Sequence, residues 1–171
     1  MPYSIGELDR MALDQFVAAA GWVFEHSPWV AERAWHRRPF ESREQLAARM
    51  NEEVTAASPG AQLALLLAHP DLGTRAKISQ SSTAEQAGAG LDQLTAAEHA
   101  RLTELNEAYR AKFGFPFIYA VKGSGKFAIL EALGRRLGNN PQEEFQEALR
   151  QVYRIAGFRL ESIVSDQEEH A

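Results

Sequence analysis

A series of helix-start signals is the feature of this sequence that most constrains its fold. In three places a small polar residue precedes a proline, namely Ser27 before Pro28, Ser58 before Pro59 and Asn140 before Pro141. A serine or asparagine side chain caps the first turn of a helix, and proline fits the first helical position. Three further pairs have the spacing of a capping box: Ser42 with Gln45, Ser82 with Glu85, and Thr95 with Glu98.

Apolar residues recur with helical period between these signals, as at Phe127, Leu130, Leu133 and Leu137. We expect helices at roughly residues 12–24, 28–37, 42–57, 59–68, 82–91, 95–113, 126–137 and 141–165. The apolar segment 115–121 has no partner strand in the sequence, so we expect a buried extended connection or a short helical turn there. The expected fold class is all-α: a single domain over residues 1–171, a compact bundle of about eight helices, with a frayed tail at about 166–171.

Composition excludes several kinds of site and partner. The 171 residues include no cysteine, so disulfides, thiolate metal sites and a cysteine nucleophile are excluded. The formal net charge is −5 and the charges are interspersed, which argues against a nucleic-acid partner. The longest apolar stretches fall far short of the ~20 residues that span a bilayer, and the first residues lack a basic signal-peptide region. We therefore expect no membrane association and a cytoplasmic location.

A histidine at the end of an apolar segment is the first candidate for chemistry. His69 precedes Pro70, and proline disfavours the helical conformation for the residue before it. His69 should therefore lie on a turn at the exit of a buried helix, where the helix dipole favours its protonated form. Such a histidine can give or take a proton near neutral pH. The alternative is a histidine that only caps the last carbonyl groups.

The helix expected to open at Ser82 is the second candidate. Its first backbone N–H groups form a natural cradle for an anion or a carbonyl oxygen. Glu85 is the acid of a capping box if the segment has only a structural role. Gln86 beside it offers both a donor and an acceptor.

An arginine near the apolar face of the last helix is the third candidate. Arg159 lies three residues after Ala156 and seven after Val152, along the edge of the apolar stripe. An inward arginine requires a carboxylate partner, which a substrate could supply. The alternatives are a snorkelling side chain and an internal pair with a glutamate. The aromatic segment 106–118 is either core with a tight turn or a backbone wall that approaches a planar ligand.

Together, a histidine, a glutamate, an arginine and helix N-terminal amides indicate proton transfer on a small anionic substrate without a cofactor. The sequence has no nucleophile-elbow serine, no glycine-rich phosphate loop and no pair of histidines with metal-ligand spacing. Asp71 close to His69 is weak support for a metal, so we expect none.

Three segments, in this order, resemble one known family. They are His69-Pro70-Asp71-Leu72, the stretch STAEQAGAGL at 82–91, and LNEAYRAKFGFPFI at 105–118. The combination is similar to the 2-oxo-4-hydroxy-4-carboxy-5-ureidoimidazoline (OHCU) decarboxylases. The likeness also takes in FEHSPWV at 24–30 and residues 155–160, so it covers nearly the whole chain.

The resemblance implies an all-helical enzyme, usually a homodimer, that uses no cofactor and makes (S)-allantoin in uric acid degradation. His69 matches the catalytic histidine, a proton donor, and Arg159 matches an inward arginine; Glu85 would tune or orient His69. The matching ligand-binding segments consist of Pro70, then Ser82, Thr83, Ala84, Glu85 and Gln86, and then Ile118, Tyr119, Ala120, Val121 and Lys122. The chain has no room for a hydroxyisourate hydrolase domain, so that enzyme and urate oxidase would be separate proteins.

Two other functions stay open. A non-catalytic helical interaction module would explain the caps and stripes, but it gives no reason for His69, Glu85 and Arg159 to converge. A lyase or isomerase that acts on another small carboxylate could also use the same scaffold.

Overall fold

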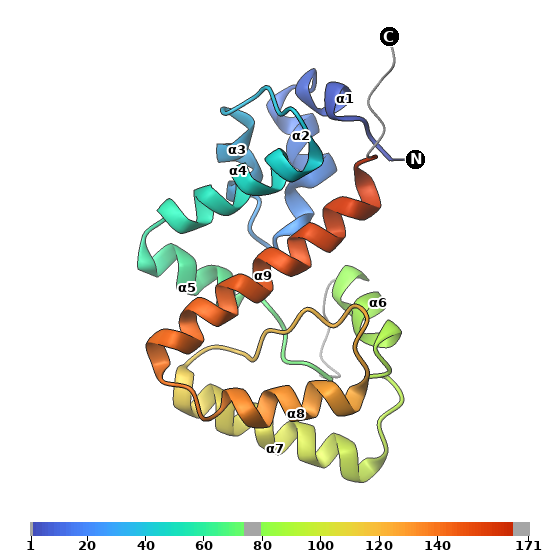
Figure 1. The fold of residues 1–171 in the computed structure, drawn as a ribbon, viewed down its shortest axis with the longest axis vertical. Helices are drawn as coiled ribbons and strands as arrows, with labels where there is room; N and C mark the ends of the chain where they lie inside the picture. The colour runs from blue at the N-terminus through green and yellow to red at the C-terminus, as the bar shows by residue number, and fades with distance from the viewer. Residues whose placement is uncertain (1, 74–79, 166–171) are drawn as a thin grey trace. The chain divides into compact units, whose positions relative to one another are not determined.

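The computed structural model of the chain describes residues 2–73 and 80–165, and within them the protein is helical (Figure 1). The elements in order are α1 Ile5–Asp9, α2 Leu13–Ala20, the 3₁₀-helix η1 Gly21–Val23, α3 Trp29–Trp35, α4 Arg43–Ala56, α5 Pro59–Leu67, α6 Gln80–Gly88, α7 Ala96–Phe113, α8 Lys126–Arg136 and α9 Pro141–Ile163. The only β-type pairing in the described residues is an isolated bridge between Tyr3 and Val164. The prediction of an all-α fold is confirmed.

Side-chain caps begin several helices where the sequence predicts them. Ser42 Oγ accepts a hydrogen bond from the Gln45 N–H at 3.0 Å at the start of α4. Thr95 and Glu98 form a complete capping box at the start of α7, with bonds of 3.1 and 2.9 Å. Each bond satisfies a backbone N–H that has no acceptor within its own helix.

The N-terminal part of the chain, up to Ser27, differs from the prediction. A short helix, α1, starts at a capping box between Ser4 and Glu7, which the sequence analysis did not identify. The helix expected over 12–24 ends at Ala20 and continues as η1. Ser27 does not cap α3, because its hydroxyl donates to the Glu25 carbonyl at 2.9 Å.

The chain divides into two compact units, and the first comprises Met1–Leu65 and Tyr153–Ala171. Within it α3 packs against α2 and α4. The backbone of Tyr3 ties the two chain segments together: its N–H donates to the Ile163 carbonyl at 2.7 Å, and its carbonyl accepts from the Ser165 N–H at 2.8 Å. The tail predicted at 166–171 lies outside the described residues.

The second unit is Leu66–Val152, in which α7 and α8 lie side by side (Figure 1). The connection between these helices is non-helical over residues 116–121 and buried apart from the half-buried Tyr119, which agrees with the first of the two alternatives expected for 115–121. The rings of Phe117 and Tyr119 stack with centroids 5.9 Å apart, as expected for residues i and i+2 on one face of an extended chain. The single-domain organisation stays a prediction. None of the helices in the described part of the chain is long and apolar enough to cross a membrane.

Candidate active site

His69 lies where the sequence predicts, on a turn just beyond the end of α5. The helix ends at Leu67, and the His69 N–H donates to the Leu66 carbonyl at 3.2 Å. The histidine is buried, with 7% of its surface exposed. A buried imidazole at this end of a helix meets the positional requirement for a proton carrier shielded from bulk water.

Side chains from α6 and α7 hold the three residues that follow Pro70. The contacts are Arg110 Nη2 to Asp71 Oδ1 at 3.3 Å, Asn106 Nδ2 to the Leu72 carbonyl at 2.9 Å, and the Gly73 N–H to Gln86 Oε1 at 2.8 Å. Asn106 and Gln86 are both buried. The backbone is therefore held at Leu72 and Gly73, while the Asp71 contact joins two exposed side chains.

Gly73 ends this turn in a conformation that favours glycine. Its φ is +73°, and a Cβ placed there would lie 2.4 Å from Leu102 Cδ2. Leu102 is itself buried, so it has little room to withdraw. Backbone conformation and packing thus both disfavour a side chain at this position.

The stretch from Ser82 to Gln86 lies inside α6, and one prediction about it is wrong. The helix begins at Gln80, so Ser82 is in the first turn and neither caps the helix nor forms the expected capping box with Glu85. Residues 74–79, which precede the helix, lie outside the described residues.

This shift changes what each residue of the stretch can offer a ligand. Ser82 and Thr83 are the third and fourth residues of α6, so within this stretch they lie nearest to its N-terminus. Ala84, Glu85 and Gln86 follow in the next turn, where N–H groups bond within the helix, so only a side chain could contact a ligand there. Ser82 is buried, Glu85 half-buried, and Thr83 and Ala84 exposed.

Arg159 is buried in the first unit, which confirms the prediction of an inward arginine. Its exposed fraction is 5%, and its Nη2 donates to Glu25 Oε2 at 2.9 Å. Its Nη1 makes longer bonds to the carbonyls of Val23 at 3.3 Å and Trp22 at 3.4 Å. The internal pair with a glutamate, one of the alternatives for this residue, is therefore present.

Sequence reasoning did not identify Glu25 as the partner of this arginine. Glu25 has an exposed fraction of 2% and follows the buried Phe24. A carboxylate beside a buried aromatic residue is the one local signal that could have marked it, because ionised groups are buried only with a partner.

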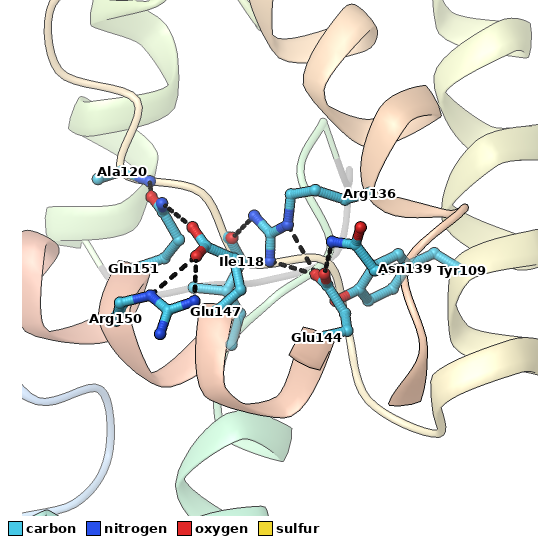
Figure 2. A network of polar contacts seen from close by, with 9 residues as sticks. All are labelled: Tyr109, Ile118, Ala120, Arg136, Asn139, Glu144, Glu147, Arg150 and Gln151. Carbon is cyan, nitrogen blue, oxygen red and sulfur yellow. Dashed lines mark hydrogen bonds and ion pairs between the residues drawn. The ribbon is translucent and has the colours of Figure 1, made fainter. Parts of the chain in front are cut away.

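The third predicted segment, residues 118–122, is the end of the extended connection in the second unit. Arg136 donates from Nη1 to the Ile118 carbonyl at 2.7 Å, and the Ala120 N–H donates to Gln151 Oε1 at 3.0 Å (Figure 2). Lys122 is exposed at the turn that follows. Neither Arg136 nor Gln151 was identified from the sequence.

The structure thus connects part of the predicted site directly. Gln86 of α6 contacts the turn after His69, and both belong to the second unit. Arg159 belongs to the first unit with its partner Glu25. The convergence of His69, Glu85 and Arg159 stays a prediction. Among the described residues, no group of three or more His, Cys, Asp or Glu side chains is arranged to hold a metal ion.

Comparison with known proteins identifies the family. The OHCU decarboxylase family model matches residues 9–161. The 2-oxo-4-hydroxy-4-carboxy-5-ureidoimidazoline decarboxylase of Haloferax volcanii is 46% identical over 92% of this chain and 94% of its own length. The protein of the same name from Halalkalicoccus jeotgali is 44% identical over 98% of each chain. These matches define an enzyme of the carboxy-lyase class. The chain belongs to the OHCU decarboxylase family.

Solved structures agree with this assignment. A crystal structure of (S)-allantoin synthase has a TM-score of 0.79 at 36% identity and covers 95% of this chain. This chain spans only 54% of that synthase. An OHCU decarboxylase crystallised in the presence of (S)-allantoin has a TM-score of 0.68 at 22% identity, with 89% of this chain and 97% of that one covered, and it supports the fold.

Proposed function

We propose that this chain decarboxylates 2-oxo-4-hydroxy-4-carboxy-5-ureidoimidazoline and protonates the product on one face to give (S)-allantoin. The observation that carries the proposal is the match to two decarboxylases of that name, at 44–46% identity over almost their whole length. A non-catalytic interaction module would give no reason for such a match.

The substrate makes a resident cofactor unnecessary in this proposal. Its carboxylate is attached to a ring carbon next to a C=N bond. When the carbon–carbon bond breaks and CO₂ leaves, the electron pair delocalises into the C=N group. The protein then has to hold the carboxylate out of the ring plane and deliver one proton to the neighbouring ring carbon of the former C=N bond, which carries the ureido group. The carbon that lost CO₂ keeps its hydroxyl oxygen and becomes a carbonyl as the hydroxyl proton leaves. Both tasks are positioning and general-acid chemistry.

His69 is the proposed proton donor. It is buried on a turn that Asn106 and Gln86 hold in place, at the end of α5 where the helix dipole favours a cation. In the proposed step the imidazolium loses its proton to the ring carbon and becomes neutral. Glu85, half-buried on α6, would orient His69 or favour its charged form.

A His69→Asn variant tests this role. The variant is mixed with freshly generated substrate, and the (S) product is followed by circular dichroism. Because the substrate also decays spontaneously to racemic allantoin, we expect slow loss of substrate without an enantiomeric excess. Formation of (S)-allantoin at the native rate would show that His69 is not the donor.

Substrate binding is assigned to Arg159 and to the three predicted segments. Arg159 would hold an anionic or carbonyl group through its guanidinium. Pro70, residues 82–86 and residues 118–122 would contact the ring and the ureido group. A crystal structure with (S)-allantoin bound tests the assignment: if His69, Glu85 and Arg159 lay out of hydrogen-bond reach of the ligand, the site would be wrong.

We also infer the setting of the enzyme. Urate oxidase and hydroxyisourate hydrolase activities would supply the substrate of this decarboxylase. A homodimer in the cytoplasm is part of the same proposal. Sedimentation analysis tests the dimer, cell fractionation tests the location, and a coupled assay from uric acid tests the supply of substrate.

A further inference from the structure

We propose that Gln151 and the Arg136–Glu144 pair are positioning residues that fix which edge of residues 118–122 faces the substrate. The inference rests on the proposed function, because it assumes that this segment contacts the ligand. None of the three side chains is part of the predicted site.

The segment needs outside partners for its backbone. Residues 118–121 are extended and buried apart from the half-buried Tyr119, and no strand lies beside them in the described part of the chain. Buried N–H and C=O groups must nevertheless be hydrogen-bonded. In an extended chain the polar groups of residues i and i+2 point to the same edge, so Ile118 and Ala120 share one edge and Tyr119 and Val121 the other.

Two side chains occupy the edge of Ile118 and Ala120. Arg136, at the end of α8, donates a hydrogen bond to the Ile118 carbonyl at 2.7 Å. Gln151, on α9, accepts a hydrogen bond from the Ala120 N–H at 3.0 Å (Figure 2). Both side chains are buried, with exposed fractions of 4% and 6%. The backbone N–H and C=O groups of Tyr119 and Val121 therefore lie on the opposite edge, directed away from Arg136 and Gln151.

The guanidinium of Arg136 is held in place on several sides. Its Nε donates to Glu144 Oε1 at 2.7 Å, and its Cζ lies 4.5 Å from the centre of the Phe117 ring. Glu144 also accepts bonds from the Tyr109 hydroxyl at 2.5 Å and from Asn139 Nδ2 at 2.9 Å. Arg136 therefore cannot turn away from Ile118 without breaking a buried ion pair.

The amide of Gln151 is oriented by its second contact. Its Nε2 donates to Glu147 Oε1 at 2.8 Å, and Glu147 Oε2 accepts from Arg150 Nε at 2.9 Å. An ionised carboxylate only accepts hydrogen bonds, so the amide nitrogen must face Glu147. The amide oxygen therefore faces Ala120 and accepts the hydrogen bond from its N–H.

Two substitutions at Gln151 test the proposal. Gln151→Met keeps the size of the side chain but removes the acceptor. We expect it to raise KM and the Kd for (S)-allantoin about three- to tenfold, the effect of one hydrogen bond, with a smaller change in kcat. Gln151→Glu restores the acceptor and should return both constants to within about twofold of the wild type.

Protein stability provides a readout that separates positioning from folding. Gln151→Glu places a second carboxylate beside Glu147, so it should lower the melting temperature while it restores KM. If the role were only structural, KM would follow stability in both variants. Arg150→Gln is the matched control, because it removes only the exposed end of the network and should leave KM unchanged.

A second pair of variants keeps the test independent of Gln151. Arg136→Lys retains a cation for Glu144 but loses the planar fork that also reaches Ile118, so KM should rise. Arg135→Lys, at an exposed neighbouring position, should leave KM as it is. Amide exchange of Ala120, followed by NMR, should become faster in Gln151→Met and stay slow in Gln151→Glu.

The outcomes separate this inference from the proposed function. A wild-type enzyme that makes (S)-allantoin, together with a Gln151→Met variant whose KM and Kd are unchanged, would overturn the positioning role alone. A folded wild-type protein that neither turns over the ureidoimidazoline nor binds (S)-allantoin would overturn the proposed function, and the inference with it.

Discussion

Each of the two units buries one arginine against one glutamate, and the two pairs are built differently. In the second unit Glu144 is wholly buried and takes bonds of 2.5–2.9 Å from Arg136, Tyr109 and Asn139. In the first unit the bonds of Arg159 include one to Glu25 at 2.9 Å and two to carbonyl oxygens at 3.3–3.4 Å.

The difference separates a structural pair from one suited to a ligand. Arg136 balances the charge of Glu144, and Tyr109 and Asn139 occupy further acceptor sites of its carboxylate. The two bonds from Arg159 Nη1 are long and therefore weaker, so we expect a substrate anion to replace these carbonyl oxygens while the bond to Glu25 stays. We therefore expect removal of Glu144 to affect folding most, and substitution of Arg159 to affect turnover most.

Removal of Glu144 should have the largest effect. Glu144→Ala leaves Arg136 buried without its carboxylate, and we expect the free energy of unfolding to fall by about 3–5 kcal/mol. Urea denaturation measures it. Glu143→Ala, at an exposed position in the same turn, is the control and should cost well under about 1 kcal/mol. A loss of similar size in both variants would contradict the view of Glu144 as the centre of a buried network.

Substitution of Arg159 should show the opposite balance. Arg159→Gln removes the charge that is proposed to bind the substrate, so we expect kcat/KM to fall about 10- to 100-fold, as for loss of a charge-assisted hydrogen bond. Steady-state kinetics with fresh substrate measure this change, and urea denaturation of the same sample measures stability. If kcat/KM were unchanged while stability collapsed, Arg159 would belong to the structural kind of pair.

The tyrosine beside Glu144 offers a milder test. Burial and the hydrogen bond to Glu144 raise the pKa of Tyr109 far above its ordinary value, so its hydroxyl stays a donor at any physiological pH. Tyr109→Phe should lower the free energy of unfolding by about 1.5–3 kcal/mol, since the lost bond ends on a charged group. Tyr153→Phe, which loses an exposed contact to Thr55, should cost less than about 1 kcal/mol.

The smallest expected effect is a dependence on acid pH. Burial raises the pKa of Glu147, but hydrogen bonds from Gln151 and Arg150 lower it more, so the pKa lies below its ordinary value of 4.5. The stability that Glu147 adds is therefore complete above that value and is lost as the pH falls through the lowered pKa. Urea denaturation between pH 6 and pH 3 measures this loss as a fall in the free energy of unfolding. Glu147→Gln should remove this contribution, which is less than about 1 kcal/mol.

Local signals in the sequence predict much of the fold. Ser42 and Thr95 cap the helices that they were expected to cap, because a capping bond joins residues only three apart. The same rule would have found α1 at Ser4 and Glu7. It fails at Ser27, whose hydroxyl binds the Glu25 carbonyl, since a hydroxyl can donate as well as accept.

The partners of the buried charges could not be predicted in this way. Glu25 is 134 residues from Arg159, and Gln151 is 31 residues from Ala120. Periodicity marks Arg159 as inward but does not say which carboxylate meets it. The start of α6 was misplaced for a related reason, because Ser82 and Glu85 have capping-box spacing although the helix already begins at Gln80.

The tight fit of Gly73 against Leu102 has a consequence for the tolerance of this chain to random mutation. In a saturation library selected for (S)-allantoin formation, substitutions at Gly73 should be almost absent among survivors. Gly114 shares the positive φ but has open space where a Cβ would stand, so alanine and asparagine should survive there. The difference in survival between these two glycines would measure how strongly the turn after His69 is constrained by packing, beyond the constraint set by its backbone.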